Sequence, residues 1–154
     1  MILLSACLAG ISCKYNGEDN RNPDAVALVH SGRAIPVCPE RLGGFPTPRP
    51  AAEIRGGDGN DVLDGTARVV RRNGDDVSAG FIRGAEKCLT LVQDLHIKTA
   101  IMKNRSPSCG VSSIYNGDFS GTAISGSGVC SALLMRHGIQ VCSEEDDLSS
   151  ILEL

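Results

Sequence analysis

Three short apolar segments, each followed by a loop that contains cysteine, constrain the fold of this chain most strongly. They span residues 1–6, 34–37 and 97–102. Between the first two, Asn22-Pro23-Asp24 is typical of a helix start and Ser31-Gly32 of a helix end. Because a strand, a helix and a second strand in succession indicate a parallel crossover, the sequence predicts an α/β fold with a mainly parallel sheet.

The remaining elements follow from the spacing of apolar residues and from turn residues. Helical spacing across residues 77–95 predicts the clearest helix, and Asp76 or Ser78 is suited to cap its start. Three further features are expected: a small antiparallel pair at 53–54 and 67–71, a helix at 128–137 that stops at Gly138, and a strand at 139–142 before an acidic tail with helical character. The 154 residues fit one compact domain, so we predict a single three-layer domain over residues 1–154.

Charge and composition exclude several functions. The net charge is -3, which provides no overall basic field for binding DNA. Aromatic residues make up 3% of the chain, which is few for a protein that stacks the bases of a single strand. No apolar run approaches the roughly 20 residues of a membrane span, and the first residues lack the basic charge of a secretory signal. We therefore expect a cytoplasmic protein that binds neither DNA nor a membrane.

The cysteines are the most informative residues for function. There are seven, an odd number, and none lies in a C-x-x-C motif. Since a cytosolic chain of this size does not need disulfides to fold, we expect some of these thiols to have a chemical role. Any site that they share must be assembled by the fold.

Three cysteines occupy the same place relative to the predicted strands. Cys7 follows the first strand, Cys38 the second, and Cys109 lies a few residues past the third. The carboxyl ends of parallel strands lie at one edge, where α/β proteins bind ligands, so these thiols are expected to converge. Three thiolates suit a zinc site with an open position or an iron–sulfur cluster with one free iron, and the alternative is three unrelated loop cysteines.

The other cysteines are expected to be less directly involved. Cys88, Cys130 and Cys142 lie on predicted helices or strands, where buried cysteine behaves as a small hydrophobic residue. Cys13 shares the first loop with Cys7 and is either a further ligand, a reserve thiol or a structural residue.

Polar residues beside the three cysteines are suited to acid–base chemistry. Glu40 lies two residues after Cys38, and Ser106 and Ser108 precede Cys109, so these groups can activate water and relay protons. Cations in the same loops would offset the charge of thiolates and lower thiol pKa values. These cations are Lys14, Arg21, Arg49, Lys103 and Arg105.

Four motifs together resemble a bacterial family first described as a domain of unknown function, whose characterised members are thiouracil desulfidases. The motifs are SACLAGISCKYNG at 5–17, VCPERLGGFPTPRPAAEI at 37–54, KNRSPSCG at 103–110 and IYNGDFSGT at 114–122. The resemblance implies a 4Fe-4S cluster held by Cys7, Cys38 and Cys109, with one iron open to the sulfur of a thionated pyrimidine. It also implies Glu40 and Ser106 as base and acid. Cys13 fits the first motif too, and Asn16 stands where the family pattern suggests aspartate.

The resemblance therefore implies a non-redox desulfidase that converts thiouracil-type pyrimidines into uracil and sulfide. We expect Arg49, Lys103 and Ser108 to contact the substrate. Two alternatives stay open: a zinc-binding structural or regulatory module that uses the same cysteines, and a desulfidase for thiouridine in tRNA. The tRNA alternative requires Arg49, Lys103 and Arg105 to join one basic surface, and the negative net charge disfavours it. The sequence leaves the preferred thionated substrate and the oligomeric state open.

Overall fold

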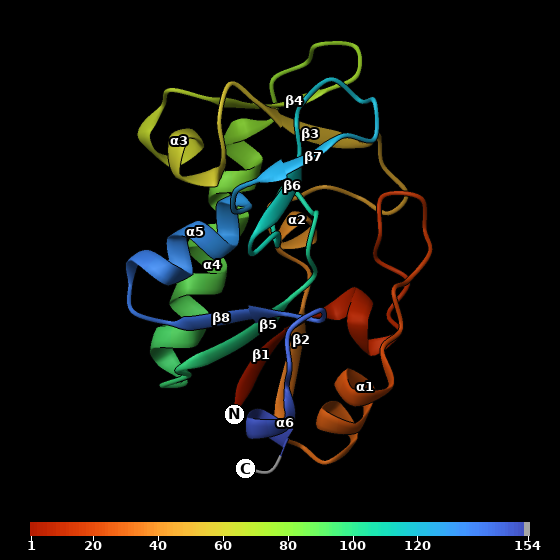
Figure 1. The fold of residues 1–154 in the computed structure, drawn as a ribbon, viewed down its shortest axis with the longest axis vertical. Helices are drawn as coiled ribbons and strands as arrows, with labels where there is room; N and C mark the ends of the chain where they lie inside the picture. Colours follow the sequence, from red (N-terminus) through yellow and green to blue (C-terminus); the bar gives the residue numbers. More distant parts are fainter. Residues whose placement is uncertain (153–154) are drawn as a thin grey trace.

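A four-stranded parallel sheet with helices on both faces forms the centre of the computed structural model, which describes residues 1–152 (Figure 1). The strands are β1 (Ile2–Ser5), β2 (Ala34–Val37), β5 (Thr99–Met102) and β8 (Gln140–Ser143), in the order β2-β1-β5-β8. β1 pairs Ile2 with Ala34 on one side and with Thr99 on the other. β1 thus lies between β2 and β5, and the order of the strands changes direction at β1. In open α/β sheets such a change of direction leaves a crevice at the carboxyl end of the strand, where ligands bind.

The two faces of the sheet bury alternate residues of the strands. Leu4 and Ile101 pack with Leu28 on one face, beneath η1 (Ala6–Ala9), α1 (Pro23–His30) and α6 (Ser149–Leu152). Leu3 and Ala100 pack on the opposite face, beneath α4 (Ser78–Asp94) and α5 (Val129–Arg136). The two central strands, β1 and β5, are covered on both faces and are apolar at three of four positions each, as expected for such strands. The predicted three-layer α/β fold is confirmed, and the acidic tail contributes the short α6.

The ends of the helices follow local capping chemistry. α1 begins where the side chain of Asn22 accepts hydrogen bonds from the N–H groups of Asp24 and Ala25, at 3.0 and 3.2 Å. Before α4, Asp76 accepts from the N–H of Ser78, while the hydroxyl of Ser78 accepts from the N–H of Val69. The N-cap position of α4 is Val77, so neither predicted residue occupies it; Asp76 binds the first N–H of the helix from one residue earlier, and Ser78 links α4 to the neighbouring strand.

Two antiparallel pairs are inserted between the strands of the main sheet. β3 (Ala52–Arg55) and β4 (Arg68–Arg71) form the predicted pair, with the unpredicted helix α3 (Gly59–Asp64) between them. β6 (Ser113–Tyr115) pairs with β7 (Ala123–Ser125), and the one-turn helix α2 (Pro39–Leu42) follows β2. α2, α3, β6 and β7 were not predicted, because their three to six residues are too few to show a hydrophobic period. No helix among residues 1–152 is long and apolar enough to cross a membrane.

Candidate active site

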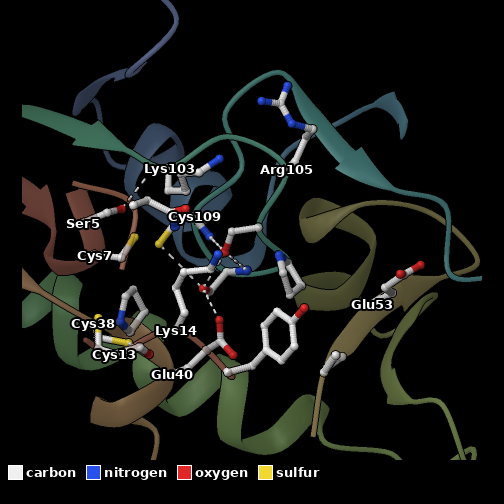
Figure 2. Close-up of a pocket in the computed structure, with 18 of the residues that line it drawn as sticks. Ser5, Cys7, Cys13, Lys14, Cys38, Glu40, Glu53, Lys103, Arg105 and Cys109 are labelled. Atoms are coloured by element: carbon white, nitrogen blue, oxygen red, sulfur yellow. Dashed lines mark hydrogen bonds between the residues drawn. The ribbon is translucent and has the colours of Figure 1, made fainter. Parts of the chain in front are cut away.

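A cleft of about 510 Å³ opens at the carboxyl ends of β1, β2 and β5. Its lining includes four cysteines, which are Cys7, Cys13, Cys38 and Cys109. Figure 2 shows these four side chains on one side of the cleft and Glu53 on the other. The walls away from the cysteines come from the inserted pairs, because Glu53 belongs to β3, and Tyr115 and Phe119 to β6 and the turn after it. The sheet thus supplies the thiols, and the insertions enclose them.

The structure brings together the three cysteines that the strand ends predict. Cys7 lies in η1 directly after β1, Cys38 lies between β2 and α2, and Cys109 lies in the loop after β5. The three sulfurs lie close enough to interact electrostatically, since negative charge on Cys7 or on Cys38 raises the pKa of Cys109. Burial raises the pKa of Cys7 and of Cys109 above the ordinary value. Both thiols are therefore protonated at neutral pH unless a positive group binds beside them.

Polar groups beside these sulfurs act in the opposite direction. The hydroxyls of Ser5 and Ser108 favour the thiolate of Cys109, and the Oγ of Ser108 lies 3.6 Å from its sulfur. The side chain of Asn20 does the same for Cys7, with support from the charge of Lys103. Such donors suit sulfurs that carry negative charge when they bind a cationic group.

Cys13 lies beside Cys38. The thiol of Cys13 donates a hydrogen bond to the sulfur of Cys38, which lowers the pKa of Cys38 from 9.0 to about 6. The same contact raises the pKa of Cys13. The guanidinium of Arg49, whose Nη2 lies 4.0 Å from the Cys38 sulfur, also favours the Cys38 thiolate. Cys13 is therefore a fourth thiol of this site, and it stabilises the thiolate of Cys38.

Glu40 lies in the first turn of α2 and is held by Arg49. The Nε of Arg49 lies 3.1 Å from Oε1 of Glu40, and the two side chains are only 4% and 15% exposed. The remaining donors of Arg49 contact the carbonyl oxygens of Pro46 and Cys13 and the hydroxyl of Thr47. Arg49, which lies in the proline-rich loop at 43–50, therefore joins this loop, the first loop and Glu40 in one buried cluster.

The loop before Cys109 presents two hydroxyls to Glu40. The Oγ of Ser108 donates to Oε2 of Glu40 at 3.0 Å and lies 3.1 Å from the Oγ of Ser106. The Oγ of Ser106 accepts the backbone N–H groups of Ser108 and Cys109. A carboxylate and two hydroxyls thus form a continuous hydrogen-bonded chain beside the cysteines.

The start of α5 holds this loop in place. The N–H groups of Val129 and Cys130 donate to the carbonyl oxygens of Pro107 and Ser108, at 2.9 and 2.8 Å. The first N–H groups of a helix lack partners within the helix, so the loop satisfies them. Gly128 makes this contact possible, because a Cβ there would lie 2.5 Å from the carbonyl carbon of Ser108.

Comparison with known proteins identifies the family. The sequence model of the 2-thiouracil desulfurase family matches residues 2–146. The chain belongs to this family. The uncharacterized protein YbbK of Bacillus subtilis (strain 168) is 49% identical over 152 residues, which cover 99% of this chain and 100% of YbbK. A solved structure of the [4Fe-4S]-dependent thiouracil desulfidase TudS matches with a TM-score of 0.84 and 45% identity, covering 99% of this chain and 94% of that one. The resemblance predicted from the four motifs is confirmed.

Two further predicted cations of this desulfurase family member, Lys103 and Arg105, pair with carboxylates. The Nζ of Lys103 lies 3.4 Å from Oε2 of Glu144, and its side chain is 22% exposed at the cleft. Nη1 of Arg105 lies 2.9 Å from Oε1 of Glu145. Lys14 also lines the cleft, whereas Arg21 packs beside Gly10 of the first loop. Carboxylates thus accompany the charges of Lys103 and Arg105.

Sequence reasoning assigned no role to Asn104, which organises the loop between β5 and β6. Its Oδ1 accepts the N–H groups of Val111, Ser112 and Ser113, and the residue is 5% exposed. An asparagine directly after a strand and within the KNRSPSCG motif was a usable signal, because asparagine side chains often bind loop backbone.

The remaining cysteines lie outside the cleft. Cys88 and Cys130 are fully buried between α4 and α5, as predicted for core residues. Cys142 is half-buried on β8, where its sulfur lies 3.5 Å from the carbonyl oxygen of Ala100. All seven cysteines are free thiols in the described part of the chain.

The donor set at the strand ends fits an iron–sulfur cluster. Cysteine thiolates are the usual ligands of such clusters, and hydrogen bonds to their sulfurs tune them. Cys7, Cys38 and Cys109 supply three thiols, with hydroxyl and amide donors beside two of them. Within residues 1–152, no three His, Cys, Asp or Glu side chains converge closely enough to bind a single metal ion.

Proposed function

We propose that this protein is a [4Fe-4S]-dependent thiouracil desulfidase that acts by hydrolysis. The observation that carries the proposal is the convergence of Cys7, Cys38 and Cys109 with Glu40 and Ser106 in one cleft. The TudS structure, 45% identical, supports the same cofactor and substrate class. In this proposal one domain over residues 1–154 converts a thionated pyrimidine and water into uracil and sulfide.

The three cysteines at the strand ends would hold the cluster. Bound there with one iron free of protein ligands, the cluster supplies a Lewis acid for the substrate sulfur, which makes the adjacent carbon electrophilic. Cys13 would support the thiolate of Cys38 through its hydrogen bond.

The chain itself would supply the acid and the base. Glu40, fixed by Arg49, is positioned to take a proton from the attacking water, and Ser106 to give a proton to the substrate. All three residues predicted to contact substrate, which are Arg49, Lys103 and Ser108, line the cleft. Arg49 and Ser108 bind Glu40 and would act through it.

Anaerobic purification tests the cofactor. We expect iron and acid-labile sulfide near four each per chain, as a cubane cluster requires, and sulfide release from 2- or 4-thiouracil. Zinc alone, or no metal after reconstitution, would contradict the proposal and favour the zinc-binding module. Colour distinguishes the two at once, because a zinc protein is colourless.

The Glu40→Gln variant tests the base. The amide keeps the shape of the side chain but takes up no proton at neutral pH, so we expect normal iron content and turnover below 1% of wild type, on the scale of about 10²–10⁴-fold for general base catalysis. An active Glu40→Gln protein would remove Glu40 from the mechanism.

A small free pyrimidine fits the site better than tRNA. Arg49 is buried, and Lys103 and Arg105 each pair with a carboxylate, so these three residues do not present the basic surface that a tRNA substrate requires. Sulfide release from free thiouracil compared with thiolated tRNA decides between the two substrates. The seven free thiols agree with the cytoplasm as the place of action.

A further inference from the structure

The cleft holds most of the aromatic side chains of this protein. The sequence contains three Phe, two Tyr and no Trp. Phe45 and Phe81 pack against each other in the core, with ring centroids 5.3 Å apart. The other three, which are Tyr15, Tyr115 and Phe119, line the cleft. A chain with few aromatic residues thus places most of them where a planar ligand can bind.

Phe119 lies on the turn between β6 and β7, and strand β3 holds this turn in place. Oε1 of Glu53 accepts the N–H groups of Gly117 and Phe119, at 3.0 and 3.1 Å. From the same strand, the guanidinium of Arg55 donates to the carbonyl oxygen of Gly117 through Nε and Nη2, at 3.2 and 2.9 Å. These hydrogen bonds fix the backbone on which Phe119 is carried.

The backbone of Phe119 has an uncommon conformation. Its φ is +57°, in the left-handed region that bulky side chains seldom adopt. Such a conformation persists only where the surrounding contacts determine it, and it is typical of ligand-binding sites. The guanidinium carbon of Arg72 lies 5.0 Å from the centroid of the Phe119 ring, so a cation–π contact covers one face of the ring. The ring is therefore held in a defined orientation while the residue lines the cleft.

We propose that Phe119 binds the planar ring of the thionated pyrimidine by stacking and that Glu53 is a positioning residue for Phe119, an inference that rests on the function proposed above. The four cysteines lie on one side of the cleft and Glu53 on the other (Figure 2). A substrate whose sulfur is bound on the cysteine side therefore presents its ring to the opposite wall. Offset stacking on an aromatic side chain requires a flat partner. The wall thus selects flat, conjugated thiones over saturated ones.

Phe119→Leu tests the stacking contact, because leucine keeps the apolar bulk at the same φ and removes the flat ring. We expect it to raise the KM for thiouracil about 5-fold, while kcat stays within about twofold of wild type and iron content is unchanged. Ser120→Ala is the matched control, since Ser120 is an exposed residue of the same turn and does not line the cleft. It should keep the wild-type KM.

Glu53→Ala and Glu53→Gln separate positioning from charge. Glutamine keeps a side-chain oxygen that accepts the N–H groups of Gly117 and Phe119, whereas alanine removes it. We expect Glu53→Ala to raise KM as Phe119→Leu does, and Glu53→Gln to restore most of the wild-type value. Because Glu53 acts through Phe119, the double variant should be no worse than Phe119→Leu alone. Equal KM values for the Ala and Gln variants overturn the positioning role.

Calorimetric titration of the cluster-loaded protein with uracil gives a readout that does not depend on turnover. Wild type should bind uracil, which is flat, more tightly than dihydrouracil, whose ring is partly saturated, and Phe119→Leu should remove most of this difference. Uracil titrations that are equal for wild type and Phe119→Leu overturn the proposal and leave the desulfidase function intact. A wild-type protein that releases no sulfide from thiouracil overturns that function, and the uracil titration then still decides whether Phe119 binds a planar ring.

Discussion

Among single residues, Arg49 has the strongest effect on the site, because its guanidinium fixes the position of the Glu40 carboxylate. It contacts Glu40, Cys13, Pro46 and Thr47 while only 4% of its side chain is exposed. Loss of one partner of a buried ion pair costs about 3–5 kcal/mol, since it leaves the other charge without compensation. We expect Arg49→Met to lower the free energy of unfolding in urea by about 3 kcal/mol and to lower kcat.

Arg49→Lys is the matched control, because it keeps the charge and loses the planar set of donors. We expect its stability and kcat to lie between those of the wild type and Arg49→Met. Equal stability of all three proteins would contradict the structural role of Arg49.

The thiol of Cys38 gives a prediction about pH. Its pKa is about 6 in the folded protein, below the ordinary value of 9.0, chiefly because Cys13 donates a hydrogen bond to it, so Cys38 is a thiolate above pH 6. In cluster-free protein we expect alkylation of Cys38 by iodoacetamide to rise with pH and to reach half its maximal rate near pH 6, followed by peptide mass spectrometry. Cys13→Ala should shift this midpoint upward. A midpoint near 9 in both proteins would show that Cys13 does not affect Cys38.

For single residues, the sequence predicts which cysteines lie near one another better than it predicts which side chains bind each other. Cys7, Cys38 and Cys109 are found together because they follow strands of one parallel sheet. The contact of Cys13 with Cys38 and the contacts of Arg49 depend on the paths of two irregular loops. Such loops have no hydrophobic period, so the partners of their side chains cannot be derived from spacing.

At the scale of elements, the contact between α5 and the loop before Cys109 is the one that most directly shapes the site. Gly128 has φ -72° and ψ 168°, an ordinary backbone conformation, so an alanine there tests space alone. A Cβ would lie 2.5 Å from the carbonyl carbon of Ser108 and 2.8 Å from the nitrogen of Cys109. We expect Gly128→Ala to displace the loop, which lowers both iron content and kcat.

Gly17→Ala is the control for Gly128→Ala. Gly17 has φ +81° and open space around it, so alanine there causes backbone strain without a collision. We expect it to cost about 1–2 kcal/mol of stability and to leave iron content unchanged. Normal iron content and kcat in Gly128→Ala would refute the role of this contact.

The elements themselves were predictable where apolar residues and a clear boundary coincide. β2 was predicted at its observed bounds, and α4 and α5 within one residue at each end, because apolar spacing defines them and Pro39 and Gly138 follow β2 and α5. β6 and β7, of three residues each, lack such a pattern and form through pairing with each other.

At the scale of the whole molecule, the proposed ligands join segments that are far apart in the chain. A group that binds the folded protein and not the unfolded chain stabilises the fold by mass action. We expect the cluster-loaded protein to have a higher Tm than the cluster-free protein in anaerobic calorimetry, by about 2–4 °C for each kcal/mol gained. An equal Tm for both forms would contradict binding by residues from three strand ends.

Cys88→Ala serves as the control for this experiment. Cys88 is fully buried in the core, so its loss should lower the Tm of both forms alike while iron content stays at the wild-type level. Iron loss in Cys88→Ala would overturn its assignment to the core.

The antiparallel pairs β3–β4 and β6–β7 form the wall of the cleft opposite the cysteines, so they determine which molecules can enter it. They are joined to each other, since Glu53 accepts the N–H groups of Gly117 and Phe119, and they lie outside the main sheet. The buried residues of the insertions, such as Ile54 and Ile114, belong to the main core, whereas Glu53, Tyr115 and Phe119 line the cleft opposite the thiols. For evolution, and for a designer of selective desulfurising catalysts, these three cleft-lining side chains are the part of the scaffold to exchange.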